Sequence, residues 1–360
     1  MAYTTIKKPS DYFNTKLYTG DGSSSRSITN VNFKPDWTWV KSRNSSDYDH
    51  MVTDVVRGTP KMLKTNSSAA EDANPGAGGI GSFDSDGFTI AAGSINNTNM
   101  NNNGTTYVGW NWLANGAGSS NTDGTITSTV SANTTSGFSI AKYTGTGANA
   151  SFGHGLGTTP AVYILKSLSG VSTWLMYHQS LGIGYHLGLN NTSAQAANDA
   201  TFANNTAPDT SKIYLGNWGD LNANGSDFIC YSFAEKQGFS KFGSYVGTNS
   251  DDGTFLYLGF KPAFIMVKAV SGSNSPGSQN WVILDNKRSS SGGNNVVQYK
   301  LFPNASDAEN TAENNHADFL SNGVKFRGGN DATNANNTYI YMAFAEAPLV
   351  GTNGITAKAR

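Results

Sequence analysis

Three lysines stand at the same place in a stretch that the chain contains three times, and a lysine can act as a nucleophile or as a general base. Each one lies six residues after a proline, and the three are Lys41, Lys166 and Lys268. Three equivalent catalytic lysines in one chain would be unusual, so we favour a structural role in which the aliphatic stem is buried and the ammonium reaches the surface. The ammonium could then pair with Asp54 in the first copy or with Asp285 in the third.

Three short strings resemble the loops of known sites but lack part of the required pattern. Residues 145–150 resemble a dinucleotide-binding loop, but that loop should open a helix, and here we expect a strand to follow. Residues 84–87 resemble a calcium loop, but Phe88 stands where an oxygen ligand is needed. Residues 153–157 resemble an oxyanion loop but directly precede a predicted strand. We therefore expect turns at all three places and no cofactor.

Metal ligands, nucleophiles and acid pairs show no catalytic spacing. The sequence has no HxH or HExxH pattern among its histidines, which are His50, His154, His178, His186 and His316. It has no Gly-x-Ser-x-Gly motif, and no acidic pair of the kind that a glycosidase needs recurs across the copies. The lone cysteine, Cys230, lies in an apolar run and is typical of a buried core thiol. The sequence therefore predicts no catalytic residue, no metal site and no enzyme activity.

The lysines belong to a longer unit whose spacing recurs in all three copies. In each copy a tyrosine precedes the proline by 17 residues, and the pairs are Tyr18 and Pro35, Tyr143 and Pro160, and Tyr245 and Pro262. Such rigid spacing indicates one structural unit repeated. The proline should mark the start of a strand, and the apolar run after it suits a strand buried on both faces. We expect Trp39, Ile164 and Met266 to be buried and equivalent.

Two further apolar blocks follow in each copy. The second block covers residues 50–54, 174–178 and 281–285, and the third covers residues 107–112, 228–233 and 339–344. An arginine stands three residues beyond the second block in the first and third copies, as Arg57 and Arg288, whereas the middle copy has Leu181. Alternating strand and turn signals of this kind favour antiparallel sandwiches.

The composition agrees with many short strands joined by turns. Charged residues make up only 14% of the chain, against about 25% in a typical domain, and Gly, Asn, Ser and Thr replace them. We therefore predict an all-β fold of three tandem antiparallel β-sandwich repeats of the jelly-roll type. The predicted boundaries are an N-terminal arm 1–15, repeat 1 at 16–115, a linker 116–136, repeat 2 at 137–236, repeat 3 at 237–348 and a C-terminal tail 349–360.

Charge and hydropathy exclude several classes of partner. The net charge is −1 and no Lys/Arg cluster is present, so we expect no nucleic acid partner. Residues 1–10 are polar and contain no apolar signal-peptide segment. No run approaches the 18 apolar residues of a membrane-spanning helix, so we expect no membrane insertion.

Several long strings resemble repeat-containing virion and tail-associated structural proteins of marine tailed bacteriophages. The opening of the chain carries the resemblance in residues 1–6, 9–20, 34–43 and 82–88, and the later part carries it in residues 238–245, 318–323 and 339–346. The resemblance covers nearly the whole chain. It implies a virion protein that is assembled in the host cytoplasm, and it supplies no catalytic residues.

We expect a non-enzymatic virion structural protein that forms a surface appendage, either a tail fibre or spike or a decoration or fibre on the head, and that contacts the host surface. The alternative is a carbohydrate-binding module that recognises a host-surface glycan, because loops rich in Asn and Asp beside aromatics suit sugars. The same loops are also ordinary turn chemistry.

The N-terminal arm carries three aromatic residues, Tyr3, Tyr12 and Phe13, in a segment too short to form a core. Such side chains stay exposed unless a partner covers them. We therefore predict that they anchor the chain to other virion proteins or to another copy in a homo-oligomer, with a trimer favoured. The alternative is that Tyr12 and Phe13 fold back onto the first repeat.

Overall fold

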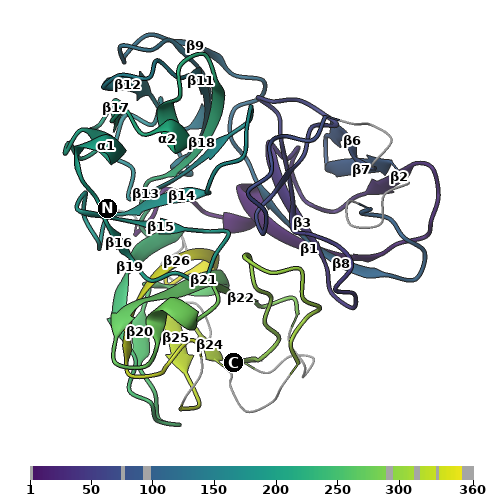
Figure 1. Ribbon diagram of the computed structural model, residues 1–360. Coiled ribbons are helices and arrows are strands. Elements are labelled where there is room, and N and C mark those ends of the chain that lie inside the picture. The colour runs from purple at the N-terminus through teal and green to yellow at the C-terminus, as the bar shows by residue number, and fades with distance from the viewer. Residues whose placement is uncertain are drawn as a thin grey trace.

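The computed structural model describes residues 3–73, 78–91, 99–288, 295–311, 317–329 and 332–350 (Figure 1). These residues form mostly β-strands in several antiparallel sheets, so the all-β prediction is confirmed. Helices are short, and they are η1 (Pro9–Asp11), α1 (Ala200–Ala203), α2 (Gly219–Asn222) and η4 (Pro276–Ser278). Within the described ranges, no helix has the length and apolar character needed to cross a membrane.

Residues 13–112, which we call unit 1, contribute two sheets. Their strands are β1 (Phe13–Thr19), β2 (Arg26–Ile28), β3 (Trp37–Ser42), β4 (Met51–Asp54), β5 (Leu63–Lys64), β6 (Gly79–Asp84), β7 (Gly87–Ala91) and β8 (Thr106–Trp112). The larger sheet has the order β1-β8-β3-β4-β5, and the smaller sheet has the order β2-β7-β6.

Residues 119–233, which we call unit 2, form the widest sheet. Their strands are β9 (Ser119–Asn121), β10 (Ser128–Asn133), β11 (Phe138–Thr144), β12 (Ala150–Gly153), β13 (Val162–Ser167), β14 (Leu175–His178), β15 (Tyr185–Gly188), β16 (Ala196–Ala197), β17 (Lys212–Leu215) and β18 (Asp227–Phe233). The larger sheet has the order β16-β15-β14-β13-β18-β11-β10-β9, and β12 pairs with β17. The segment predicted as a linker at 116–136 thus supplies β9 and β10 to this sheet.

Residues 240–348, which we call unit 3, again form two sheets. Their strands are β19 (Ser240–Val246), β20 (Phe255–Tyr257), β21 (Phe260–Gly272), β22 (Val282–Asp285), β23 (Val296–Val297), β24 (Ala317–Leu320), β25 (Gly323–Phe326) and β26 (Asn337–Pro348). The orders are β19-β26-β21-β22 and β20-β25-β24-β23. Nearly all of the tail predicted at 349–360 lies outside the described residues.

The last strand of each unit lies between the strand that carries the recurring tyrosine (β1, β11 or β19) and the strand that follows or contains the proline (β3, β13 or β21). Across these ladders Trp39 faces Trp110, Ile164 faces Tyr231, and Met266 faces Met342. The first residues of these pairs are buried, as predicted, with exposed fractions of 2%, 1% and 1%.

The prolines mark the strand starts only in part. β3 and β13 each begin two residues after their proline, but Pro262 lies inside β21, between two shifts of the pairing with β26. A proline has no N–H to donate to the ladder, so it is tolerated within a strand at such an irregularity. The predicted strand start is therefore wrong for the third copy.

The three larger sheets meet at one central core, around which Figure 1 shows the units arranged. One face of each sheet contributes to this core, whose tryptophans are Trp37, Trp39, Trp110, Trp112, Trp174 and Trp281. The opposite faces pack against the smaller sheets in three separate clusters, one in each unit. The strands after the prolines are therefore buried on both faces, which explains their continuous apolar runs.

Candidate functional site

The three recurring lysines end these central strands, and all three side chains are buried. Each ammonium donates to the carbonyl oxygen of the next residue: Lys41 Nζ to Ser42 at 3.0 Å, Lys166 Nζ to Ser167 at 3.0 Å and Lys268 Nζ to Ala269 at 2.8 Å. The prediction of an ammonium at the surface is therefore wrong. Main-chain carbonyls at the strand end satisfy its N–H groups inside the protein, so it does not need water.

Each ammonium also bonds to the loop that follows its strand. Lys41 donates to Ser45 O at 3.2 Å, and Lys268 donates to Pro276 O at 3.0 Å. Lys166 donates to Ser172 Oγ at 2.9 Å and to Ser68 O of unit 1 at 3.2 Å. Burial lowers the pKa of all three lysines to about 8. Their N–H groups hold loops in place, and Lys166 also holds a neighbouring unit.

The acids expected beside these lysines bind arginines instead. Arg57 Nε donates to Asp54 Oδ2, and Arg288 Nε donates to Asp285 Oδ2 at 2.6 Å. All four side chains are fully buried. The prediction of Lys–Asp pairs is therefore wrong, because an arginine three residues further along reaches the same carboxylate with a planar fork.

All three nitrogen atoms of each guanidinium group donate a hydrogen bond. Arg57 Nη1 binds Glu71 at 3.1 Å and its Nη2 binds Val52 O at 3.0 Å. Arg288 Nη1 binds Glu309 at 2.9 Å and its Nη2 binds Ile283 O at 3.1 Å. Buried ion pairs persist only when their remaining hydrogen bonds are satisfied, as they are at both positions.

The ends of the second blocks connect the units in a closed ring. Tyr231 Oη of unit 2 donates to Asp54 of unit 1 at 2.7 Å. Trp110 Nε1 of unit 1 donates to Asp285 of unit 3 at 2.9 Å. In the third contact His178 Nε2 of unit 2 lies 3.1 Å from the carbonyl oxygen of Tyr341 in unit 3. We call these three contacts the inter-unit ring.

His178 is neutral in this ring. Burial lowers its pKa to about 4. Its Nδ1 accepts a hydrogen bond from Ser180 N at 3.1 Å, which leaves the proton on Nε2 to be donated to Tyr341 O.

The first residues of the second blocks make a related set of contacts. Trp174 Nε1 donates to Lys64 O of unit 1 at 2.9 Å, and Trp281 Nε1 donates to Gly188 O of unit 2 at 2.9 Å. His50 occupies this position in unit 1 and accepts from Trp39 Nε1 at 3.0 Å. The two tryptophan contacts orient the units around the central core, whereas the contact of His50 stays within unit 1.

The strings that resembled known sites take structural positions. Residues 145–150 lead into β12, and residues 84–87 turn between β6 and β7. Residues 153–157 follow β12, where His154 is buried. Cys230 is buried, and burial raises its thiol pKa to about 12. In the part of the chain that the structure describes, which excludes His316, no three His, Cys, Asp or Glu side chains gather as a metal site would require.

Three buried asparagines repeat a contact that the sequence reasoning missed. The residues are Asn101, Asn222 and Asn334. Each side chain accepts a hydrogen bond from a backbone N–H in the loop that follows the strand of the recurring tyrosine, and it donates to a carbonyl oxygen of the same loop. The tyrosine of each copy donates to the carbonyl one residue before the asparagine. An asparagine five or six residues before each third block was the available signal.

The predicted anchor residues lie against other parts of the same chain. Tyr3 Oη donates to Gly259 O of unit 3 at 2.6 Å, and the ring of Tyr12 lies edge-on to Phe239 at 6.0 Å. Phe13 begins β1 and stacks on Phe344 in the central core at 5.2 Å. The chain itself covers Phe13, which is 1% exposed. The anchoring role stays a prediction, without support from exposed aromatics.

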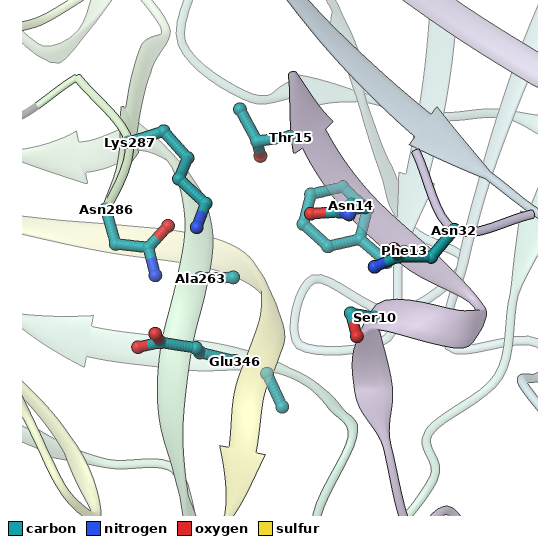
Figure 2. A pocket seen from close by; sticks show the side chains of 10 residues that line it. Ser10, Phe13, Asn14, Thr15, Asn32, Ala263, Asn286, Lys287 and Glu346 are labelled. Carbon is teal, nitrogen blue, oxygen red and sulfur yellow. The ribbon is translucent and has the colours of Figure 1, made fainter. Parts of the chain in front are cut away.

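A polar pocket of about 250 Å³ lies between units 1 and 3, as Figure 2 shows. One wall comes from η1, β1 and the loop after β2, and the other from the ends of β22 and β26 and from Ala263. Two buried polar atoms in the walls have no hydrogen-bond partner, and these are Thr15 Oγ1 and Asn286 Oδ1. Lys287 and Glu346 stand at the exposed rim and bring opposite charges.

This pocket is the most developed candidate for binding among the described residues, because unsatisfied polar atoms lie in the walls of a recess. Among curated proteins, none matches the chain. A family model covers residues 8–348, which is nearly the whole chain. The chain therefore belongs to the family described as Domain of unknown function (DUF7483).

Proposed function

We propose that the chain is a non-enzymatic structural protein of a bacteriophage particle. In this proposal, three tandem β-sandwich repeats of the jelly-roll type close around one core and form a surface appendage. The appendage is a tail fibre or spike or a decoration or fibre on the head. The observation that carries the proposal is the inter-unit ring, in which residues that could do chemistry serve as contacts between units.

The division into three sandwich repeats is supported by the recurring strand order. In each unit a larger sheet faces a smaller one across a separate apolar cluster. Equivalent residues pair across equivalent ladders, as Trp37 with Trp112, Val162 with Phe233 and Phe264 with Phe344. A single ancestral unit, copied twice, would produce this arrangement.

A structural role is supported by the use made of the lysines and of the buried Asp–Arg pairs. A catalytic group must have a free hydrogen-bonding or nucleophilic atom facing a substrate. The ammonium groups donate to main-chain carbonyls, and the two carboxylates each receive an arginine, backbone N–H groups and an aromatic donor.

The location on a virion rests on the resemblance to marine phage structural proteins. The expected partners are other virion proteins and further copies of this chain, with a trimer favoured, and no nucleic acid. A carbohydrate-recognition role is the second candidate, and the polar pocket between units 1 and 3 is the observation that favours it.

A reconstruction of the purified particle tests the proposal. We expect density of three lobes around one centre, fitted by this structure, on the outside of the tail or head. Failure to find the chain in purified particles by mass spectrometry would contradict the virion role. Cleavage of a host polysaccharide by the pure protein, abolished by one substitution, would contradict the non-enzymatic role.

A further inference from the structure

The strand that carries the recurring tyrosine has an equivalent residue in each unit, and the surroundings of that residue differ among the three units. The equivalent residues are Thr15 in β1, Ile140 in β11 and Phe242 in β19, which face Trp110, Tyr231 and Met342 in their ladders. A strand edge with unpaired N–H and C=O groups attracts a hydrogen-bonding partner.

The backbone of Thr15 points away from β8. Leu113 N donates to Tyr12 O at one end of this ladder, and Gly20 N donates to Thr105 O at the other end. Bonded and non-bonded positions alternate in an antiparallel pair. The even-numbered residues of β1 therefore bond to β8, and the N–H and C=O of Thr15 face the free edge, where the pocket lies.

In units 2 and 3 other groups of the chain close the equivalent edge. In unit 2 the strand β10 covers it, with Ser131 opposite Ile140. In unit 3 two side chains cover it: Gln179 Nε2 donates to Phe242 O at 2.7 Å, and Glu235 accepts from Phe242 N at 2.8 Å.

Unit 1 lacks both of these side-chain contacts. Asn286 takes the place of Gln179, since each donates its backbone N–H to the carbonyl of the residue after the recurring proline, which is Ala263 for Asn286 and Ala161 for Gln179. Asparagine is one methylene shorter, and its Oδ1 has no partner. Glu346 binds Lys261 at 2.8 Å. Among the described side chains, none forms a hydrogen bond with the backbone of Thr15.

The two closed edges indicate which chemical groups fit the open one. In each, a donor N–H meets the strand carbonyl and an oxygen meets the strand N–H. A secondary amide supplies both groups. Beside this strand edge, Thr15 Oγ1 can donate or accept a hydrogen bond and Asn286 Oδ1 can accept one, and neither atom has a partner. Both atoms therefore suit hydroxyl groups of a ligand.

The size and charge of the pocket further limit the class of ligand that fits. A volume of about 250 Å³ is below the roughly 300–1,000 Å³ of pockets for drug-sized ligands, so a single small ring fits. At the rim, Glu346 is already paired with Lys261 and Lys287 is exposed to solvent, and the remaining lining residues are uncharged, which favours a neutral ligand. The apolar residues of the lining, Phe13, Ala263 and Ala345, are buried, so the surface that a ligand meets is mainly polar.

We propose that this pocket binds the acetamido group of an N-acetylated amino sugar. The amide would bond to the backbone of Thr15, and the ring hydroxyls would bond to Thr15 Oγ1 and Asn286 Oδ1. A peptide that adds to the edge of β1 would offer the same amide, but the space beside that edge, bounded by Asn286, Lys287 and Glu346, is only about 250 Å³ and suits one ring. The proposal does not depend on the virion role.

Binding of two methyl glycosides to the full chain tests the proposal by calorimetry or saturation-transfer NMR. Methyl N-acetyl-β-glucosaminide should bind at least about tenfold more tightly than methyl β-glucoside, because the glucoside leaves the strand edge unpaired. Equal binding of the two, or no binding of either at millimolar concentration, would overturn it. Binding of N-acetylglycine N-methylamide in preference to the glycoside would assign the edge to a peptide and overturn it too.

Two variants locate the site. Asn286→Gln should extend the amide toward Thr15 O, as Gln179 of unit 2 extends to Phe242 O of unit 3, and abolish binding without lowering the melting temperature. Thr15→Val removes an unpartnered hydroxyl and should weaken binding severalfold. Ser139→Ala is the matched control, since it removes an unpartnered buried hydroxyl outside the pocket and should leave binding unchanged. Wild-type affinity in both pocket variants would overturn the proposal.

Discussion

The inter-unit ring contains two charged junctions and one neutral junction at equivalent positions. Asp54 with Arg57, and Asp285 with Arg288, are buried ion pairs that each receive an aromatic donor from another unit. The third junction has His178 in place of the acid, and Leu181 stands where the arginine would be. The same position can therefore hold either a buried ion pair or a neutral histidine, provided that every buried polar group has a hydrogen-bond partner. The comparison indicates that the contact between units depends more on the position of the residue and on the satisfaction of its hydrogen bonds than on its charge.

Removing one charge should have the largest effect. Asp285→Ala leaves Arg288 and Trp110 Nε1 without their buried partner, so we expect a loss of about 3–5 kcal/mol in the free energy of unfolding. His178→Ala, at the neutral junction, should lose less, about 1–3 kcal/mol. Urea denaturation of both variants measures the difference. Equal losses would show that the charge itself makes no difference between the junctions.

Acid should weaken the neutral junction. The pKa of His178 is about 4 in the folded chain, against 6.5 as its ordinary value. As pH falls below 6.5, unfolded chains gain this proton and folded chains do not, so stability falls until pH 4. At about 1.4 kcal/mol per pH unit, the loss amounts to roughly 3 kcal/mol. His178→Gln keeps a donor for Tyr341 O and should lack this part of the loss; a pH profile identical to that of the wild type would be the contrary result.

The recurring lysine of unit 2 should contribute more to stability than its equivalent in unit 3. Lys166 donates to Ser68 O of unit 1, whereas the bonds of Lys268 stay within unit 3. Lys166→Met should therefore destabilise the chain by about 1.5–3 kcal/mol more than Lys268→Met, the contribution of one hydrogen bond to a charged group. Chemical denaturation at pH 7 compares them. A smaller loss for Lys166→Met would mean that the contact with Ser68 adds nothing.

Converting a charged junction into the neutral type should have the smallest effect. Asp285→His combined with Arg288→Leu reproduces the pair His178 and Leu181 in unit 3. We expect the double variant to recover at least about 2 kcal/mol of the loss seen in Asp285→Ala, because it leaves no unpaired buried charge. Recovery of none of it, in the same denaturation experiment, would make the ion pair itself indispensable.

The sequence predicted the fold class and the buried central strands because their signals are local. Apolar runs of fixed spacing identified Trp39, Ile164 and Met266 as buried. The partners of the lysines and aspartates were not predictable in the same way. Lys166 depends on a carbonyl of another unit, and Asp54 depends on Tyr231, which is 177 residues away in the sequence.

The pocket was also not predictable from the sequence, because it depends on a small difference between two side chains. Asn286 and Gln179 differ by one methylene, and the difference matters only once the free edge of the first strand is known. The N-terminal aromatics were expected to be exposed because no local core was available to them. The central core that buries Phe13 includes Phe264 and Phe344 from unit 3, so burial of Phe13 follows from how the units are arranged in space.

The central claim is that three units share one core and are locked by the inter-unit ring. Differential scanning calorimetry of the full chain tests it most directly. A shared core predicts one cooperative transition, with calorimetric and van't Hoff enthalpies that agree. Separate transitions for the units, each unaffected by Asp285→Ala in its neighbour, would show three independent domains and contradict the account.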